Sequence, residues 1–475
     1  MKTTTSHRAP RNLRTTIQKI VFLVFVLGLA TSTLTGCRRL LSRQPDKPPI
    51  IIILIDTWRA DHAGVYGYQR DITTNIDRFA AGAVRFDNAQ ATASWTVPSI
   101  VSLFTGVYPW RHGITRATLD GEKGVKSQPI LNPRYVTLAE SLKAAGYATF
   151  GVSANGHLDP KYGMGQGFDN YEVFSFSNQG QVNDTLKKWN RQLRRTYRKG
   201  QPYFLFIHYF DPHHPYLPHK KWLDEWRPGF DPKSVADYTD ANKFMKKVSK
   251  QFFYDNPAEM QVLIDLYDSE IAFVDNSLGG LLSKLPGAKD AVVVVTADHG
   301  EAFGDHRNML HGSDLYRETM RVPLIIQWPG RQFAGRSVTA PVSLVDLYPT
   351  LAGWAGAAPP PYLDGRDLRA LPDRPAGDDL LYAETHRGDE HHWMAVISGQ
   401  YKWMREEDTG VEMLYRLDQD PSETRNLAES EAEQNARLRE LWEKRPHPAV
   451  LFEPGDTGKN IDPDLEKKLR NLGYL

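Results

Sequence analysis

Continuous apolar runs alternate with amphipathic stretches along this chain. Residues 50–55 form an unbroken aliphatic run that leads straight into Asp56, the pattern of a strand buried on both faces of a parallel sheet. Residues 291–296 form the strongest late run of this kind and lead to Asp298. Because such strands alternate with helical patterns, the chain is predicted to be α/β, with a large, mostly parallel sheet between helices. Further strands are expected over residues 148–152 and 203–208, and helices over 136–145, 182–198 and 258–285.

The pattern becomes shorter and more polar after the Pro-rich segment 357–361. Residues 394–398 and 401–404 flank a Gly399-Gln400 turn, which is typical of an antiparallel hairpin. A charged helical stretch follows at residues 430–443. We therefore expect two parts: a catalytic domain over residues 49–375 and a smaller α+β subdomain with antiparallel strands over residues 376–475.

Composition favours a globular protein with a large core, since 41% of the residues are hydrophobic and 24% are charged. Lys+Arg 58 against Asp+Glu 57 leaves a formal charge of +1, so no overall field attracts nucleic acid. Binding must therefore depend on a local site, and no obligate protein partner is evident.

The N-terminus has the order of a secretory signal. Basic residues precede the apolar run 20–29, and a small, polar stretch follows at residues 30–33. The sequence Leu34-Thr35-Gly36-Cys37 resembles a bacterial lipobox and contains the chain's single cysteine. We predict a lipoprotein signal peptide over residues 1–36, lipidation at Cys37 and a basic, Pro-rich tether over residues 37–48.

This interpretation places the protein in a bacterial cell envelope, lipid-anchored in the periplasm or at the outer membrane. An uncleaved membrane anchor and a buried cysteine are the alternatives for Cys37. Either of them still leaves the catalytic part outside the cytoplasm. Without further cysteines the exported domain folds without disulfides.

Thr96 lies where a helix is expected to begin. Pro98 fits the first turn of that helix, and Thr96 occupies its N-cap region. The free N–H groups and the dipole of a helix start favour anions, so a sulfate or phosphate would lie beside the Thr96 hydroxyl. A threonine at a helix start usually has only the structural role of capping the helix. The assignment of Thr96 as a nucleophile therefore needs support from other residues.

Asp56 and the pair Asp298-His299 follow two predicted strands and are expected at the same sheet edge. Two carboxylates and an imidazole suit Zn²⁺ or Mn²⁺. A metal that also contacts Thr96 would lower the pKa of its hydroxyl. The alternative for Asp298-His299 is a helix cap beside a surface histidine.

Several segments of the chain resemble the sulfatase family of the alkaline-phosphatase superfamily. They follow one another in the family's order from about residue 49 to 430. The resemblance implies a mixed, alkaline-phosphatase-like sheet, a metal held by Asp56, Thr96, Asp298 and His299, and a nucleophile at Thr96. The matching segments are residues 53–62, 66–68, 75–80, 108–113, 211–216, 296–301, 321–324, 414–417, 420–423 and 426–428.

The chain departs from the sulfatase pattern at the nucleophile. Thr96 stands where the family has a Cys or Ser that becomes formylglycine, and Ile100 stands where it has Arg. Thr57 replaces a second aspartate, and His299 replaces an Asn or Gln. Because histidine favours transition metals over calcium, we expect Zn²⁺ or Mn²⁺ rather than Ca²⁺.

These departures resemble phosphoethanolamine transferases and lipoteichoic acid synthases, which use an unmodified threonine. The resemblance implies substrate-binding roles for His208, His213 and His311. His213 and His311 would bind the nonbridging oxygens of the ester or a second metal, and one of them could protonate the leaving group. The alternative is that they are polar histidines in surface loops.

The predicted function is metal-dependent hydrolysis of sulfate or phosphate esters through a covalent Thr96 intermediate. The substrate would be such an ester, for example on an envelope glycan or lipid, and the lipid anchor would attach the enzyme to a membrane. Two alternatives remain: an envelope phospho-substituent transferase, and a catalytically silent binding lipoprotein.

Overall fold

The computed structural model describes residues 45–115, 119–120, 126–127, 129–177, 179–373, 379–387, 390–445 and 450–456. The predicted signal peptide, the lipidation site Cys37 and most of the tether lie outside these residues. No helix within the described ranges is long and apolar enough to cross a membrane.

The central strand of the fold is β1 (Ile50–Ile55), as the apolar run predicted. All 6 of its residues are buried, because parallel neighbours flank it and helices cover both faces. Ile50 is paired with Phe204 of β8 (Tyr203–Tyr209) on one side and with Val292 of β9 (Val292–Thr296) on the other.

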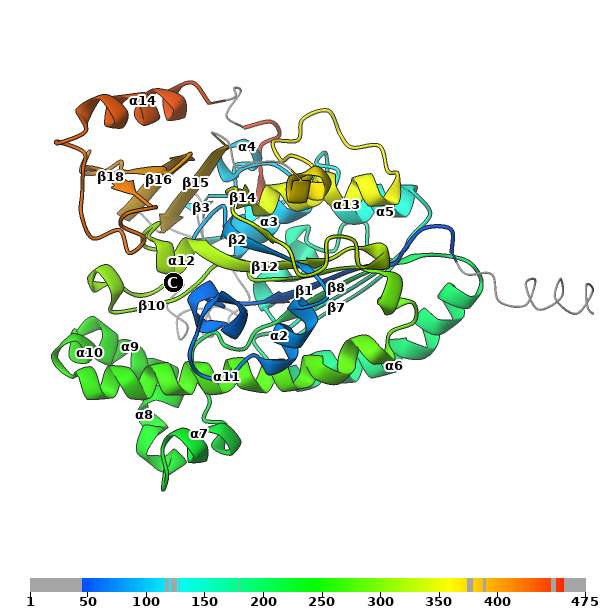
Figure 1. Ribbon diagram of the computed structural model, residues 1–475, viewed down its shortest axis with the longest axis horizontal. Helices are drawn as coiled ribbons and strands as arrows, with labels where there is room; N and C mark the ends of the chain where they lie inside the picture. The colour runs from blue at the N-terminus through cyan, green and yellow to red at the C-terminus, as the bar shows by residue number, and fades with distance from the viewer. Residues whose placement is uncertain are drawn as a thin grey trace, which may run out of the picture.

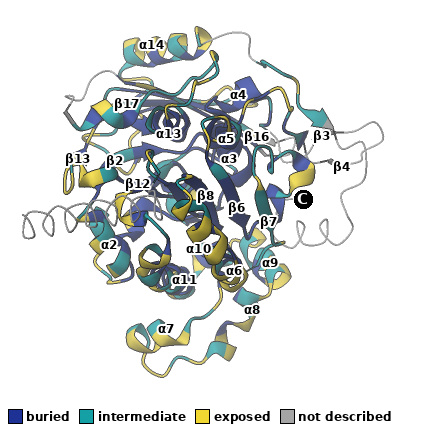
Figure 2. Ribbon diagram, turned by 90° about the vertical axis from the view of Figure 1, so that its right-hand side faces the viewer, coloured by how far each residue is buried: buried dark blue, intermediate teal, exposed yellow. Residues whose placement is uncertain are grey.

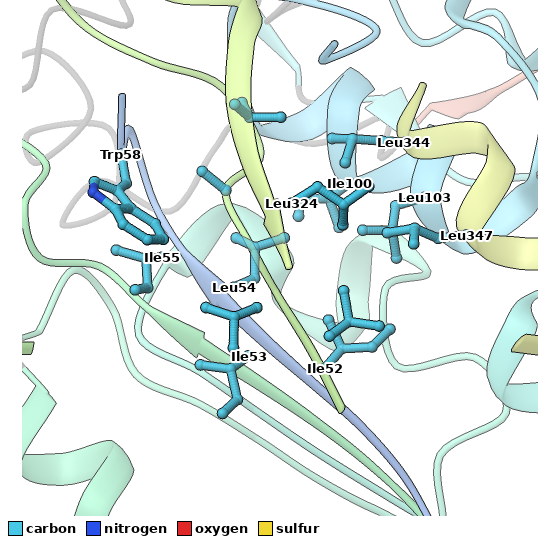
Figure 3. Packing of buried hydrophobic residues seen from close by; sticks show 14 of the residues in the cluster. Ile52, Ile53, Leu54, Ile55, Trp58, Ile100, Leu103, Leu324, Leu344 and Leu347 are labelled. Atoms are coloured by element: carbon cyan, nitrogen blue, oxygen red, sulfur yellow. The ribbon is translucent and has the colours of Figure 1, made fainter. Parts of the chain in front are cut away.

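Successive side chains of β1 enter opposite layers of the core. In Figure 3, Ile52 lies toward Leu103 and Leu347, whereas Ile55 lies beside Trp58. All of these side chains have at most 1% of their surface exposed. The strand therefore joins two hydrophobic layers into one core.

The main sheet has 9 strands in the order β13-β2-β12-β9-β1-β8-β6-β7, with β14 also paired to β2. β12 runs antiparallel to both β9 and β2, while β9, β1, β8, β6 and β7 are parallel to one another. The predicted mixed, mostly parallel sheet is thus confirmed. The remaining strands are β2 (Val84–Gln90), β6 (Ala148–Ser153), β7 (Asn170–Val173), β12 (Arg321–Gln327), β13 (Ser337–Val338) and β14 (Val342–Ser343).

Helices cover both faces of this sheet (Figures 1 and 2). In Figure 1, one group lies above the sheet: α3 (Thr96–Thr105), α5 (Leu138–Ala144) and α13 (Leu347–Ala355). Another lies below: α2 (Thr74–Ala80), α6 (Gln179–Arg198) and α11 (Pro257–Lys284).

Most of the expected elements are found within a few residues of their predicted bounds. The helix expected from residue 136 begins at Leu138, because Thr137 accepts a hydrogen bond from Glu140 N–H and the Glu140 carboxylate bonds back to Thr137 N–H. The sequence pattern did not predict the short helices between β8 and α11. These are α7 (Lys220–Trp226), α8 (Ala236–Thr239), α9 (Ala241–Ser249) and α10 (Phe252–Asp255).

A second sheet of 4 antiparallel strands, β15-β16-β17-β18, lies beyond the Pro-rich segment. The predicted hairpin is present, with Ser398 paired to Tyr401 across the turn. Trp403 and Leu414 of this sheet pack with Leu438 and Trp442 of α14 (Ala432–Glu443). The strands are β15 (Leu380–Arg387), β16 (Glu390–Ser398), β17 (Tyr401–Glu406) and β18 (Glu412–Arg416). The exact boundary between the two predicted parts stays a prediction.

A buried ion pair connects this second sheet to the main domain. Lys402 Nζ of β17 lies 2.9 Å from each carboxylate oxygen of Glu423, and both side chains are 2% exposed. The same Nζ donates to the carbonyl of Leu315 at 2.6 Å, while Glu423 accepts from the N–H of Arg317 at 3.0 Å. Both partners of the pair thus also bond to the segment that precedes β12.

Candidate active site

Two carboxylates meet where β1 and β9 end. Asp56 follows β1, Asp298 lies two residues after β9, and both are fully buried. Asp56 N–H donates to the carbonyl of Tyr209, and Asn155 Nδ2 donates to Asp56 Oδ2 at 3.0 Å. The adjacency of the parallel strands therefore brings together the residues that the sequence predicted at this edge.

Thr96 lies beside these carboxylates at the start of α3. Its Oγ1 is 3.4 Å from His299 Nε2, and Ser99 Oγ donates to the carbonyl of Asp298 at 2.7 Å. The predicted N-cap role of Thr96 is wrong: Trp95 is the N-cap, and Thr96 is already the first helical residue. Its hydroxyl consequently lies at the helix start, near the cluster of acidic and imidazole groups.

The donor atoms around Thr96 fit a divalent metal. One ligand atom each from Asp56, His208 and Asp298 lies within 4.8 Å of the others. Asp56 Oδ1, Asp298 Oδ2 and His208 Nε2 are buried and have no hydrogen-bond partner among the described residues. Buried carboxylates without partners are costly, and a cation removes that cost.

His299 completes this arrangement. Its Nε2 lies 3.6 Å from Asp56 Oδ1 and 3.5 Å from Asp298 Oδ2. Its Nδ1 donates to the carbonyl of Gly300 at 2.9 Å, which directs the Nε2 lone pair at the carboxylates. Burial, together with the charge of Asp298, raises the pKa of Asp56 well above its usual range. A cation would therefore keep Asp56 ionised.

His208 is buried more deeply in the protein than a residue that contacts the substrate would be. Its Nε2 is 3.5 Å from Asp56 Oδ2, its Nδ1 is 3.3 Å from Ser153 Oγ, and the residue is fully buried. This position favours a contact with the metal over the predicted contact with substrate.

His213 and His311 lie together on another side of His299. The ring centroids of His213 and His311 are 4.9 Å apart, and those of His299 and His311 are 4.5 Å apart. Burial and the neighbouring His214 lower the pKa of His213 well below its usual range. Both residues are almost completely buried, so the structure does not support the alternative of surface histidines.

Glu301 orients His311. His311 Nδ1 lies 2.8 Å from Glu301 Oε1, and Tyr216 OH donates to Glu301 Oε2 at 2.9 Å. Arg59 donates from Nη1 to the Glu301 carbonyl at 3.0 Å. A carboxylate at this distance stabilises a protonated imidazole, which is the form that donates a proton to a leaving group.

Sequence reasoning assigned no role to Asn155, Ser99 or Glu301. Asn155 lies two residues after the end of β6, as Asp298 does after β9, so the strand-end rule could have found it. Ser99 and Glu301 act through contacts between distant elements, for which the sequence pattern carried no signal.

The segment between β9 and β12 also contacts the C-terminal part. His306 Nδ1 lies 2.9 Å from Glu318 Oε1, and its Nε2 donates to the carbonyl of Glu423 at 3.0 Å. Its ring stacks on Tyr316 with centroids 3.8 Å apart. Burial alone would lower the pKa of His306, but the bond to Glu318 raises this pKa to about 9.

This contact predicts a pH-dependent stability. The pKa of His306 is higher in the folded than in the unfolded chain. Protonated His306 therefore stabilises the fold fully below about pH 6.5, and this stabilisation is lost as the pH rises through about 9. At pH 6 we expect His306→Gln to lower the free energy of unfolding by roughly 1–3 kcal/mol. Urea unfolding at pH 6 and at pH 9.5 measures this, with the exposed His391→Gln as control. An equal loss at both pH values would contradict the prediction.

With this geometry established, comparison with known proteins identifies the family. The Sulfatase sequence profile matches residues 48–357. The chain belongs to the Sulfatase family. A second profile, N-sulphoglucosamine sulphohydrolase, C-terminal, matches residues 304–445. The family resemblance inferred from the sequence is thus confirmed, and the protein is an ester hydrolase.

Individual members of the Sulfatase family align along most of the chain. An ulvan-active sulfatase of Formosa agariphila is 27% identical over 466 residues, covering 89% of this chain and 85% of its own. The solved structure of a 2-O GAG sulfatase has a TM-score of 0.68 at 21% identity, covering 84% of this chain and 91% of its own. The phosphonate monoester hydrolase of Agrobacterium radiobacter has a TM-score of 0.65 at 20% identity, covering 84% and 94%. These structures share the Sulfatase-family fold.

Proposed function

We propose that this protein is a metal-dependent hydrolase of sulfate or phosphate esters that uses Thr96 as its nucleophile. The observation that carries the proposal is the position of Thr96: its hydroxyl lies at a helix start, 3.4 Å from His299 Nε2 and next to the buried cluster of Asp56, Asp298 and His208. A site that only capped a helix would not need this cluster.

Asp56, Asp298, His299 and His208 would hold the metal, which would lower the pKa of the Thr96 hydroxyl and neutralise charge on the transferring group. With its pKa lowered, the Thr96 hydroxyl would release its proton to water, and Oγ1 would then form a bond to sulfur or phosphorus as the bond to the leaving oxygen breaks. His311, oriented by Glu301, donates a proton to that oxygen. His213, whose ring packs against that of His311, would line the space that the ester occupies. Water then hydrolyses the Thr96 ester and regenerates the hydroxyl.

The chemistry of Thr96 favours phosphorus among the candidate esters. A threonine sulfate lacks the elimination route that a formylglycine hydrate provides, and the superposable phosphonate monoester hydrolase shows that this fold carries phosphorus chemistry. The ulvan-active sulfatase supports a sulfated glycan as the alternative substrate. Attachment through Cys37 would place the enzyme among the glycans and lipids of a bacterial envelope.

Metal removal tests the proposal. Chelator-treated protein should lose at least about 10²-fold in turnover, and Zn²⁺ or Mn²⁺ should restore it where Ca²⁺ does not. Turnover is compared on an aryl sulfate, a phosphate monoester, a phosphodiester and a phosphonate monoester. Asp298→Asn should behave like chelated protein, and Asp290→Asn, at an exposed position, like wild type. Turnover that persists without metal would refute metal dependence.

A further inference from the structure

A second cluster of metal-ligand side chains lies outside the site described above. It joins the loop that follows β8 to helix α11, and its members are Asp211, His219 and Glu270. One ligand atom from each lies within 4.8 Å of the others. Asp211 and Glu270 are 4% and 1% exposed, so two acids are close together in the interior.

The hydrogen bonds of the cluster leave atoms unused. Glu270 Oε1 accepts from the N–H of Leu217 at 2.8 Å, but its Oε2 is buried and has no partner in the described ranges. His219 Nε2 is also buried and unpartnered there. A cation satisfies both atoms at once.

The surroundings favour a bound transition metal. His219 supplies an imidazole nitrogen to the cluster, and imidazole is a ligand that suits Zn²⁺ rather than Ca²⁺ or Mg²⁺. The ring stacks on Phe273 of α11 with centroids 4.0 Å apart, so its orientation is fixed. Gln179 adjoins the cluster: its backbone N–H donates to Asp211 at 2.9 Å, and its side-chain Oε1 is buried without a partner in the described chain.

We propose that Asp211, His219 and Glu270 form a second divalent-metal site, which takes Zn²⁺ and joins the loop between β8 and α7 to helix α11. Imidazole nitrogen and carboxylate oxygen are both ligands of Zn²⁺, and water would complete the four-coordinate site. His213 lies between Asp211 and His219 in the sequence. The metal therefore fixes both ends of the loop that carries His213, and its role is structural.

Counting bound zinc on matched variants tests the site. The metal-free full chain is dialysed against Zn²⁺, and zinc per chain is measured for wild type, Glu270→Gln, His219→Gln and Asp298→Asn. Glu225→Gln, exposed on α7, is the control. We expect two zinc ions in wild type and the control, and one in each of the other three. Equal zinc in wild type, Glu270→Gln and His219→Gln would overturn the second site.

Thermal unfolding supplies a readout independent of the count. In metal-free buffer Glu270→Gln should melt at or above the temperature of wild type, since it removes a buried charge. At 100-fold excess of Zn²⁺ over its dissociation constant, the melting temperature of wild type should rise about 2–3 °C more than that of this variant. If Asp298→Asn binds as much zinc as wild type while Glu270→Gln binds one ion fewer, the proposed catalytic metal is refuted and the second site is supported. An equal gain in wild type and Glu270→Gln would contradict the second site.

Discussion

Thr96→Ala is expected to lower turnover by on the order of 10⁴-fold or more, because the substitution removes the atom that forms the covalent ester. The fold should be retained. Thr96 is not the N-cap of α3, and that helix is buried along its whole length and pinned by Ser99. Removing one hydroxyl therefore affects the chemistry far more than the packing.

Two variants make this result specific. Thr96→Ser keeps a hydroxyl at the same place and should retain turnover within about 100-fold of wild type. Thr105→Ala removes the other threonine hydroxyl of α3, which donates only to the carbonyl of Val101, and should leave turnover unchanged. Steady-state kinetics on the best of the four esters measures all three variants. Turnover by Thr96→Ala within tenfold of wild type would mean that another group is the nucleophile.

Lys402→Met is expected to cause the largest loss of stability. Its ammonium is the cation paired with Glu423 in the interior, and both groups are 2% exposed. Removing one partner of a buried pair leaves the other charge uncompensated, which costs about 3–5 kcal/mol. The unfolding free energy, obtained by linear extrapolation from urea, should fall by that amount.

The paired variants separate charge from packing. Lys402→Met combined with Glu423→Gln removes both charges and should recover more than half of the loss. Lys444→Met removes an exposed lysine that pairs with Glu440 on the surface, and should leave the free energy of unfolding unchanged. If Lys402→Met and Lys444→Met cost the same, the buried pair does not stabilise the junction between the two sheets.

The central strands that could be predicted most directly were those with an unbroken apolar pattern. β1 and β9 are buried on both faces, so their sequences contain no polar interruption. β12 was not predicted, although it is central to the sheet, because Pro323 interrupts its pattern. The structure accommodates this proline at an irregularity between Val322 and Leu324, where the pairing with β2 shifts.

The candidate site was predictable as far as strand ends and motifs could locate it. Asp56, Asp298 and His299 were expected together and lie together, since their strands are neighbours. The predicted position of Thr96 relative to the helix cap was wrong by one residue, since Trp95 is the N-cap of α3. The cluster at Glu270 had no sequence signal, since this residue lies within a long helix far along the chain from Asp211.

The central position of β1 has a consequence for folding. Its first residue, Ile50, pairs with Phe204 on one side and with Val292 on the other. Both neighbouring strands are therefore synthesised long after β1 itself. Until then an aliphatic strand has both edges unpaired, which is a template for association with other chains. Pairings this distant in sequence close slowly. The chain should therefore refold in high yield only when it is dilute, and holding chaperones that cover residues 50–55 should raise that yield.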